Sequence, residues 1–292
     1  MKPPRVLVTG VGGPAGRSVA VQLRERGAYV VGVDMALTEL PGVATLRVPP
    51  ASDPELIEAL RSIVARDAIE LVVPTVSEEL PVLAAARRVG LARVAVASAG
   101  TVRFADDKLL TARRLHAHGV PVPRFATAKE MGSLAEAYRQ LGWPLVAKPR
   151  VSRGGRGVVV IRSSSDVAWE QLDESWILQE FAPGTEYAPM LFRSAGGDTV
   201  VIVEKTALAG GETGNATRVR RLSRRARPAI ADAAVAAVDA LGLTGACDID
   251  VRCRADGTPV VLEVNARFGA NSAVAPELLD QLLMTCSSDS DE

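Results

Sequence analysis

Residues 248–269, DIDVRCRADGTPVVLEVNARFG, decide the fold because they predict a hairpin that carries polar side chains along otherwise apolar strands. Asp256-Gly257 supplies the turn, since an Asp-Gly pair tolerates the positive φ angles of a tight hairpin. Side chains alternate between the two faces of a strand. We therefore expect Glu263, Asn265 and Arg267 to share one face of the second strand.

Asp250 on the first strand is expected to lie roughly opposite this polar face. A carboxylate left in a sheet without a cation is costly, and Asp250, Glu263 and Asn265 supply the hard oxygen ligands that Mg²⁺ prefers. This interpretation is a magnesium site that takes its remaining ligands from nucleotide phosphates and water. The alternative is a surface hairpin whose polar face meets water, and the segment alone leaves both open.

The length and charge of the chain limit the classes of function that it can have. The chain has 292 residues, of which 48% are hydrophobic, enough for two or three small domains. Its 34 Lys and Arg residues balance 34 Asp and Glu residues, so net charge gives no reason to expect nucleic acid or an anionic membrane as a partner. The three cysteines have neither zinc-ligand spacing nor the density of a disulfide scaffold, which favours a reducing cytoplasm.

No segment predicts a membrane span or a secretory leader. The first ten residues, MKPPRVLVTG, run directly into a strand without an apolar leader. The alanine-rich stretch 229–243 is interrupted by Asp232 and Asp239, so it predicts an amphipathic helix of a soluble protein.

The first hundred residues alternate apolar strands with helical patterns, which predicts a doubly wound α/β domain with a parallel sheet. After residue 100 the pattern changes to a helix that is led by Asp106 and Asp107 and stopped by Gly119. Strands separated by glycine-rich turns then predict antiparallel sheets in an α+β arrangement. The expected strands are 5–10, 29–34, 69–74, 93–98, 144–149, 158–162 and 175–181, and the early helices are 14–26, 54–66 and 78–89.

The sequence VTGVGGPAG places Gly10, Gly13 and Gly16 between a strand and a helix, and Asp34 ends the next strand. This pattern is similar to a dinucleotide fingerprint, in which glycines let the backbone approach a pyrophosphate and the acid binds a ribose. A nicotinamide-dependent reductase or epimerase is therefore one hypothesis. Close helix packing, or binding of another anionic group, explains the same glycines.

A basic, glycine-rich loop follows the strand that ends near Lys148. Backbone N–H groups of such a loop can fold over phosphates while the lysine supplies a point charge. An ordinary basic hairpin turn is the alternative. The loop residues that we take as candidates for phosphate binding are Ser152, Gly154, Gly155 and Gly157.

The sequence ILQEFAPGTEY, residues 177–187, places a glycine-containing turn after an apolar strand. Its backbone can pair with an adenine edge, Phe181 can line the base, and Glu186 can accept hydrogen bonds from ribose hydroxyls. Lys108, near the start of a helix, can reach a phosphate. Solvent exposure is the alternative for both Glu186 and Lys108. The candidate hinge residues are Gln179, Glu180, Phe181 and Ala182.

The order of these features resembles the ATP-grasp superfamily from about residue 104 to 284, and the first hundred residues resemble its pre-ATP-grasp domain. The motifs are Lys108, Lys148, the glycine-rich loop, QEFAPGTE, and Asp250 with EVNARFG. The resemblance implies a two-lobed ATP-grasp fold after the doubly wound domain. The expected division is residues 1–103 for the first domain, 104–182 for a small lobe, 183–284 for a large lobe, and 285–292 for a disordered acidic tail.

The resemblance also implies roles for individual residues. Lys108 and Lys148 would contact ATP phosphates, Glu186 would hold the ribose, and Arg267 would steady the transferring phosphoryl group. The metal ligands for Mg²⁺ would be Asp250, Glu263 and Asn265, and we expect Glu263→Ala to abolish turnover while leaving the fold intact.

The family reaction activates a carboxylate as an acyl phosphate with ATP, after which an amine displaces phosphate. We expect small-molecule carboxylate and amine substrates, and the resemblance implies a homodimer. Arg218 opens an arginine-rich stretch, 218–227, which is either a solvated basic face leading into a helix or a site for the substrate carboxylate. D-alanine:D-alanine ligases have an arginine where this chain has Asp248, so their chemistry does not transfer wholesale. A non-catalytic ATP-binding protein is a further alternative.

Overall fold

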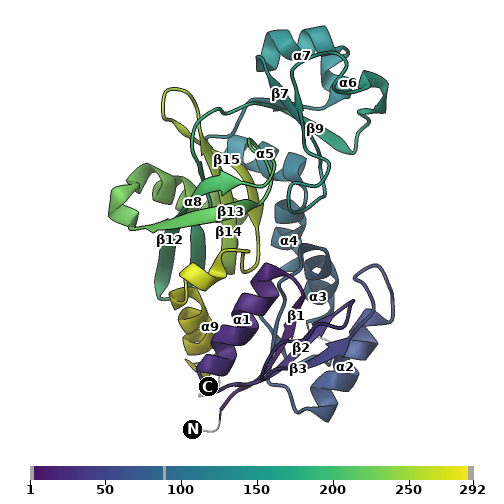
Figure 1. Cartoon of the computed structure of the whole chain (residues 1–292), viewed down its shortest axis with the longest axis vertical. Coiled ribbons are helices and arrows are strands. Elements are labelled where there is room, and N and C mark those ends of the chain that lie inside the picture. Colours follow the sequence, from purple (N-terminus) through teal and green to yellow (C-terminus); the bar gives the residue numbers. More distant parts are fainter. Residues whose placement is uncertain (1–2, 88–89, 289–292) are drawn as a thin grey trace.

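The computed structural model describes residues 3–87 and 90–288 and contains three sheets (Figure 1). The amino-terminal sheet lies at one end of the molecule, a four-stranded small lobe lies at the other, and a six-stranded large sheet lies between them (Figure 1). The combination of a parallel sheet with antiparallel sheets confirms the predicted fold class. The domain boundaries remain a proposal.

The amino-terminal sheet is wholly parallel and has the strand order β3-β2-β1-β4-β5. Val6 and Val8 of β1 pack with Leu23 of α1 on one face, and Leu7 packs with Leu60 of α2 on the other. This alternation places helices on both faces. The elements are β1 (Arg5–Thr9), α1 (Pro14–Glu25), β2 (Tyr29–Asp34), β3 (Ala44–Arg47), α2 (Leu56–Arg66), β4 (Leu71–Val73), η1 (Ser77–Glu79), α3 (Leu80–Ala86), β5 (Arg93–Val94) and α4 (Ala99–Asp106).

The small lobe, residues 125–180, is an antiparallel sheet of order β6-β9-β7-β8 with its own apolar core beneath α6 and α7. Helix α5 (Lys108–Ala117) leads into it, and Leu109 and Ala112 of α5 pack on Ile177 of the lobe. Its elements are β6 (Phe125–Ala126), α6 (Ala128–Met131), α7 (Leu134–Leu141), β7 (Leu145–Pro149), β8 (Val159–Ile161), η2 (Trp169–Gln171) and β9 (Trp176–Glu180).

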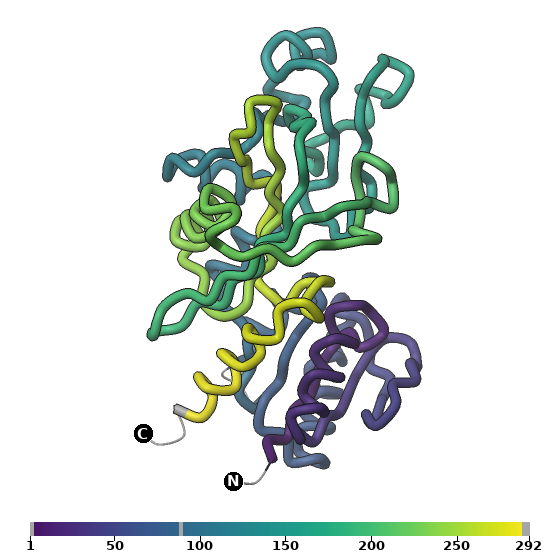
Figure 2. The backbone as a smooth tube through the Cα atoms, turned by 60° about the vertical axis from the view of Figure 1, so that its left-hand side comes forward, coloured from purple at the N-terminus to yellow at the C-terminus, as the bar shows by residue number. Residues whose placement is uncertain are grey.

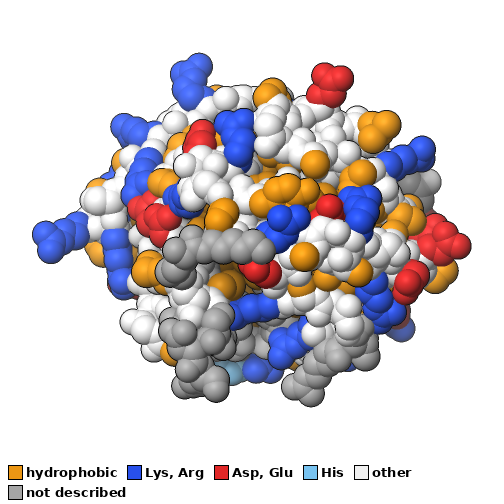
Figure 3. All heavy atoms as spheres, turned by 90° about the horizontal axis from the view of Figure 1, so that it is seen from below, with side chains coloured by type: hydrophobic (Ala, Val, Ile, Leu, Met, Phe, Trp, Pro, Cys, Tyr) orange, Lys and Arg blue, Asp and Glu red, His pale blue; other side chains and the backbone are white. Residues whose placement is uncertain are grey.

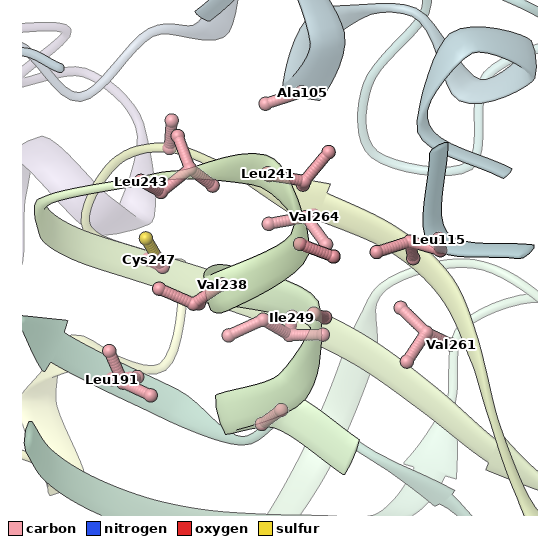
Figure 4. Packing of buried hydrophobic residues seen from close by; sticks show 14 of the residues in the cluster. Ala105, Leu115, Leu191, Val238, Leu241, Leu243, Cys247, Ile249, Val261 and Val264 are labelled. Atoms are coloured by element: carbon pink, nitrogen blue, oxygen red, sulfur yellow. The ribbon is translucent and has the colours of Figure 1, made fainter. Parts of the chain in front are cut away.

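The large sheet has the order β10-β12-β11-β14-β15, and β13 pairs with β12. Helix α8 covers one face, where Val238 and Leu241 pack against Ile249 and Val264; Figure 4 shows Cys247 pointing into this core beside Leu243. The elements are β10 (Glu186–Tyr187), β11 (Met190–Ser194), β12 (Gly197–Leu208), β13 (Ala216–Leu222), η3 (Arg224–Ala226), α8 (Pro228–Leu241), β14 (Gly245–Cys253), β15 (Pro259–Asn265), η4 (Ser272–Val274) and α9 (Glu277–Ser288).

Helix α9 returns to the amino-terminal sheet and joins it to the large sheet (Figure 2). Leu278, Leu279 and Leu282 of α9 share one apolar cluster with residues of β1 and α1 and with Met190 of β11. Arg26 Nε donates to Asp280 Oδ1 at 2.7 Å, which ties α1 to α9 at the edge of this cluster. The first and last segments of the described chain are therefore packed together.

Three expectations about local structure can be compared with the elements. The helix expected to follow Asp106 and Asp107 and to stop at Gly119 is α5, which Asp107 caps by accepting from the N–H groups of Leu109 and Leu110. The arginines of the stretch 218–227 are exposed and the stretch leads into α8 as expected, but residues 216–222 form a strand, β13, that pairs with β12. Residues 285–288 continue α9, where the Thr285 hydroxyl donates to the Gln281 carbonyl, while the rest of the expected tail lies outside the described residues.

The surface agrees with the balanced charge of the sequence. On the face seen from below, basic and acidic side chains lie scattered among apolar and uncharged ones (Figure 3). In the part of the chain that the structure describes, no helix has the length and apolar character that a membrane span requires.

Candidate active site

One cavity of about 830 Å³ lies where the three sheets meet. Residues of the small lobe, the large sheet and the amino-terminal domain all line it, and its volume is in the range of small-molecule sites, roughly 300–1,000 Å³. Most of the candidate residues predicted from the sequence contribute to its wall. The members of that predicted set are Lys148, Gly154, Gly155, Gln179, Glu180, Phe181, Ala182, Glu186, Asp250, Glu263, Asn265 and Arg267.

The hairpin of β14 and β15 has the register that its sequence predicts. Asp250 pairs with Glu263, and Asp248 pairs with Asn265 two residues earlier. The register shifts after Asp250, so the alternation is regular through the polar part of the hairpin and breaks beyond it. The two carboxylates and the Asn265 amide thus lie side by side on neighbouring strands.

Three lysines face these carboxylates. Lys108 Nζ lies 3.3 Å from Glu263 Oε2, and Lys205 Nζ lies 2.6 Å from both Asp250 Oδ1 and Glu186 Oε1. Lys148 Nζ donates to the carbonyl of Leu262 at 3.2 Å. The three ammonium groups therefore lie among buried and partly buried carboxylates, so charges of opposite sign alternate in this part of the site.

Burial and these neighbours set the pKa values. Burial raises the pKa of Asp250, and the nearby Glu263 adds to the effect against the lowering by Lys205. Burial also acts to raise the pKa of Glu263, but Lys108 and Lys148 outweigh it and lower that pKa to about 2. Burial lowers the pKa of Lys148 to about 8. Groups of both charges thus influence one another across this part of the cavity wall.

The donor set fits Mg²⁺. Two partly buried carboxylates, Asp250 and Glu263, lie close enough to repel each other, and Asn265 adds an amide oxygen, the combination of ligands that this ion takes. Within residues 3–87 and 90–288, no group of three His, Cys, Asp or Glu side chains is arranged to hold a metal, so a site here depends on the amide. The metal assignment itself stays a prediction.

Arg267 is fixed from three directions. Its Nε donates to Ser77 Oγ at 3.1 Å, a terminal nitrogen donates to Asn265 Oδ1 at 3.1 Å, and another lies 3.6 Å from Asp248 Oδ2. Ser77 belongs to the amino-terminal domain, so this contact crosses between domains. A Cβ added to Gly269 would lie 2.2 Å from Asp248 Oδ2, which explains the glycine.

Asp248 is a site residue that the sequence interpretation missed. It is 8% exposed, lines the cavity, and its Oδ1 has no hydrogen-bond partner in the structure. Asp248 lies two residues before Asp250 and therefore on the same face of the strand. This spacing is the sequence signal from which Asp248 could have been predicted as a site residue. The geometry makes it a positioning residue for Arg267.

The glycine-rich loop lies over the cavity only in part. Gly154 and Gly155 line it, whereas Ser152 instead accepts from Lys108 Nζ through its carbonyl oxygen at 2.6 Å. Gly157 is not among the lining residues and packs against Pro149. Arg153 in the same loop forms a 2.9 Å ion pair with Glu78 of the amino-terminal domain.

Lys108, like Ser152, lines a smaller adjoining pocket and not the main cavity. It is 5% exposed, so the alternative of a solvated surface lysine is wrong. Its contact with Glu263 places it directly behind the hairpin carboxylates.

The segment 179–186 forms the end of the cavity next to the small lobe. Gln179 is 2% exposed and its Nε2 has no hydrogen-bond partner in the structure, so a buried donor is available there. Phe181 lies 5.3 Å from the Arg252 guanidinium. Glu186 is buried and its two oxygens face Lys205 and Arg252, so the alternative of a solvent-exposed Glu186 is wrong.

Arg218 lies away from the site. It is exposed on β13 and is not among the residues that line the cavity. The strand pairing with β12 explains this position, because the arginine-rich segment runs along a sheet edge and not as a loop over the cavity. The idea that Arg218 binds the substrate carboxylate therefore has no support from the geometry.

The amino-terminal domain supplies an acidic wall, which we define as Asp34, Glu78 and Glu79. Asp34 Oδ2 accepts from the Gly12 N–H at 2.9 Å, so this N–H of the glycine turn already has a partner. Glu79 is 8% exposed and accepts a short hydrogen bond from the Thr9 hydroxyl. Burial raises the pKa of Glu79 to about 7.

Two relatives show similarity over part of the chain. The carbamoyl phosphate synthase large chain of Methanothrix thermoacetophila is 28% identical over 188 residues, which cover 60% of this chain and 17% of that protein. The formate-dependent phosphoribosylglycinamide formyltransferase of Burkholderia thailandensis is 31% identical over 172 residues, which cover 57% of this chain and 41% of that protein. The aligned region thus spans less than half of either relative.

Solved structures share the fold over nearly the whole chain. An L-amino acid ligase from Bacillus licheniformis matches with a TM-score of 0.70 and 22% identity, covering 94% of this chain and 69% of that one. An N5-carboxyaminoimidazole ribonucleotide synthetase in complex with ADP matches with a TM-score of 0.72 and 21% identity, covering 93% and 72%. These likenesses concern the fold, and they give no support to a nicotinamide-dependent enzyme.

A family model decides the assignment. The model described as an ATP-grasp domain matches residues 105–271, which is more than half of the chain and includes every motif of the predicted resemblance from Lys108 to Arg267. The resemblance inferred from the order of the motifs is confirmed: the chain belongs to the ATP-grasp family.

Proposed function

We propose that this protein is an ATP-dependent carboxylate-amine ligase, which activates an amino acid or another small carboxylate as an acyl phosphate and releases ADP and phosphate. The observation that carries the proposal is the convergence of Lys108, Lys148 and Lys205 on the carboxylates Asp250 and Glu263 beside one large cavity.

The chemistry needs positioning and charge neutralisation and no nucleophile from the protein. The γ-phosphoryl group of ATP passes to an oxygen of the substrate carboxylate, and ADP leaves. An amine then attacks the acyl carbon, phosphate leaves with the electrons of the broken C–O bond, and the amine loses a proton to solvent. Mg²⁺ held by Asp250, Glu263 and Asn265 supplies charge neutralisation at the phosphates.

Other residues of the cavity would bind the adenine, bind the phosphates and exclude water. Gln179 offers a buried donor with no other partner to the adenine end of the cavity. Lys148 would be the cation of the phosphate end, and Arg267, which lines the cavity and is held by Ser77 and Asn265, would steady the transferring phosphoryl group. Gly154 and Gly155 lie over the cavity, so closure of their loop excludes water that would hydrolyse the acyl phosphate.

The test is ADP release from Mg-ATP with hydroxylamine as the trapping nucleophile, which converts an acyl phosphate to a hydroxamate. Lys148→Met is expected to lower kcat/KM for ATP by about 10²- to 10³-fold, the usual effect of removing one group aimed at developing charge. Lys129→Met is the matched control, since this lysine of the same lobe has a side chain that is 80% exposed and forms a surface ion pair with Glu174.

Equal loss of activity in the two variants would contradict the proposal. Binding of ATP with no ADP release under any acid and amine would instead identify a non-catalytic ATP-binding protein. A cytoplasmic location and a homodimer, expected from cysteine usage and from the family resemblance, remain proposals that belong with this function.

A further inference from the structure

The cavity wall holds more carboxylates than the metal-ligand candidates account for. Of the carboxylates that line it in the described part of the chain, six lie within 3.6 Å of a lysine or arginine nitrogen. Asp34 and Glu79 are the two without such a cation. The complete set is Asp34, Glu78, Glu79, Glu180, Glu186, Asp248, Asp250 and Glu263.

Asp34 and Glu79 differ in how their oxygens are used. Asp34 Oδ2 accepts from the Gly12 N–H at 2.9 Å and Oδ1 accepts from the Ala36 N–H at 3.3 Å, so both oxygens have a donor. Glu79 Oε2 accepts from the Thr9 hydroxyl, whereas Oε1 has no hydrogen-bond partner among the described residues. Within the described part of the wall, Glu79 is thus the carboxylate with neither a cation nor a donor for each oxygen.

The contacts of Glu79 leave Oε1 on the cavity side. The Thr9 hydroxyl, which holds Oε2, accepts from the Thr75 N–H at 3.2 Å, and the Thr75 hydroxyl donates to the Thr9 carbonyl at 2.7 Å. Glu79 lines the cavity, and Oε1 is not among the fully buried side-chain atoms that lack a partner. Because Thr9 and Thr75 fix one oxygen, the other is the atom that can meet a ligand.

Glu79 lies at the end of the cavity where the acyl phosphate would form. Helix η1 carries both Ser77 and Glu79, and Arg267 Nε donates to Ser77 Oγ at 3.1 Å. Arg267 is the residue that would steady the transferring phosphoryl group. Gln179, which would meet the adenine, comes instead from β9 of the small lobe.

The surroundings of Glu79 suit a proton acceptor. Burial raises the pKa of Glu79 to about 7, and Asp34 and Glu78 add to the rise, while the Thr9 hydroxyl and Arg153 oppose it. These charged neighbours belong to β2, to η1 and to the glycine-rich loop. A general base works best when its pKa lies near the operating pH, because it then both takes and releases a proton readily.

We propose that Glu79 is a catalytic residue of the ligase, the general base that takes a proton from the amine as it attacks the acyl phosphate. The amine nitrogen forms a bond to the acyl carbon, its proton passes to Glu79 Oε1, and phosphate leaves with the electrons of the broken C–O bond. Glu79 then releases the proton to solvent through the cavity. This proposal rests on the proposed ligase function and concerns only its second step.

The experiment compares two nucleophiles that attack the same acyl phosphate. Hydroxylamine is uncharged at neutral pH and attacks acyl phosphates without a base, whereas an ordinary amine has to lose a proton. The acid is the one that gives the most hydroxamate with wild-type protein and Mg-ATP. The amine is chosen with wild-type protein from the common amino acids, ammonia and simple primary amines, and the amide is measured by mass spectrometry.

Glu79→Gln tests the residue. Gln can still accept from the Thr9 hydroxyl, so the fold should be retained. We expect amide formation to fall by about 10²- to 10⁴-fold, the usual contribution of a general base, while hydroxamate formation and KM for ATP stay within about twofold. Glu25→Gln, an exposed glutamate on α1, is the matched control and should change neither rate.

The pH profile separates a base from a structural residue. Relative to hydroxamate formation, wild-type amide formation should fall as pH is lowered through about 7, because Glu79 becomes protonated, and Glu79→Gln should lack this fall. Thr9→Val removes a hydrogen bond that lowers the pKa of Glu79, so the fall should move to higher pH in that variant.

The outcomes distinguish this role from the proposed function. Equal loss of amide and hydroxamate formation in Glu79→Gln, unchanged amide formation, or an unaltered pH profile would overturn the role of Glu79 and leave the ligase function standing. Wild-type protein that forms hydroxamate but couples none of the amines would also overturn the role, since Glu79 would have no amine to deprotonate. Absence of any ATP-dependent hydroxamate would overturn both.

Discussion

At the residue scale, the site is built from charges that compensate one another. Glu263 lies between Lys108 and Lys148, and Asp250 shares Lys205 with Glu186. The expectation that Glu263→Ala leaves the fold intact does not agree with these contacts, because that variant leaves buried lysines without a carboxylate. Breaking a buried pair typically costs about 3–5 kcal/mol. Asp250→Asn is the better test of the metal site, since Lys205 still has Glu186 as an ion-pair partner in that variant.

We predict that Asp250→Asn abolishes Mg²⁺-dependent ADP release and changes the melting temperature much less than Glu263→Ala does. The physical reason is that Lys205 still has the Glu186 carboxylate 2.6 Å away. Turnover assays over a range of Mg²⁺ concentrations and thermal denaturation of both variants provide the measurement. Normal turnover in Asp250→Asn would show that Asp250 is not a metal ligand.

Glu79 gives a prediction about pH. Burial, with Asp34 and Glu78 nearby, raises its pKa from 4.5 to about 7 against the lowering by Thr9 and Arg153. The folded state thus binds the proton more tightly than the unfolded state, so Glu79 lowers stability as pH rises from about 4.5 through 7. Above pH 7 this cost is on the order of 3 kcal/mol, from about 1.4 kcal/mol per pKa unit.

We therefore expect Glu79→Gln to be more stable than wild type at pH 8, by up to about 3 kcal/mol, with the difference fading toward pH 4.5. Urea unfolding at several pH values measures it. The opposite pH trend would show that Glu79 is stabilised as a carboxylate in the folded protein.

At the element scale, the hairpin of β14 and β15 could be predicted from its sequence, and the arginine-rich strand β13 could not. The Asp-Gly turn and the alternation of Glu263 with apolar residues fix the hairpin locally. The pairing of β13 with β12 depends on a distant partner, so the charges of residues 218–227 indicated only exposure. Asp107, in contrast, is placed at the start of a helix by the sequence, and its capping contacts agree.

We predict that the position of the Asp248 carboxylate requires glycine at position 269, just after β15. Gly269→Ala brings a Cβ to within 2.2 Å of Asp248 Oδ2 and should cost about 1–3 kcal/mol of unfolding free energy. The double variant with Asp248→Ala should recover part of that loss, and the coupling is read from a double-mutant cycle in urea. Gly196→Ala, whose nearest neighbour is 3.7 Å away, is the control. If the two substitutions changed the free energy of unfolding additively, the predicted contact between the added Cβ and Asp248 would be contradicted.

The loop over the cavity is predicted to need glycine at position 155. Gly155 has φ +73°, and an added Cβ would lie 2.9 Å from Gly214 Cα, so Gly155→Ala should push the loop away from the β12–β13 turn and raise KM for ATP. Gly211→Ala has the same φ and open space around it, so it controls for backbone strain. Equal values of KM in the two variants would argue against a closing role.

At the scale of the whole molecule, the apolar clusters divide the described chain into two packing units. The amino-terminal sheet, α9 and the large sheet share apolar clusters, whereas the small lobe has its own core. All three tryptophans, Trp143, Trp169 and Trp176, belong to the small lobe. Tryptophan fluorescence therefore reports on unfolding of the small lobe. Circular dichroism reports mainly on the unit formed by the amino-terminal sheet, α9 and the large sheet.

We predict that Leu279→Ala in α9, which is 1% exposed, costs about 2–5 kcal/mol and lowers the midpoint seen by circular dichroism more than the midpoint seen by tryptophan fluorescence. Leu37→Ala, at a site that is 76% exposed, should shift neither midpoint appreciably. Coincident shifts in both signals for Leu279→Ala would show that the two units unfold as one.

The return of α9 to α1 has a consequence for biosynthesis. As the chain leaves the ribosome, Leu23 of α1 and its apolar neighbours emerge more than two hundred residues before the leucines that cover them. Uncovered apolar surface makes a nascent chain prone to aggregate, so a chaperone that holds the first hundred residues during translation should raise the yield of native protein. Moving α9 ahead of β1 by circular permutation should remove that dependence.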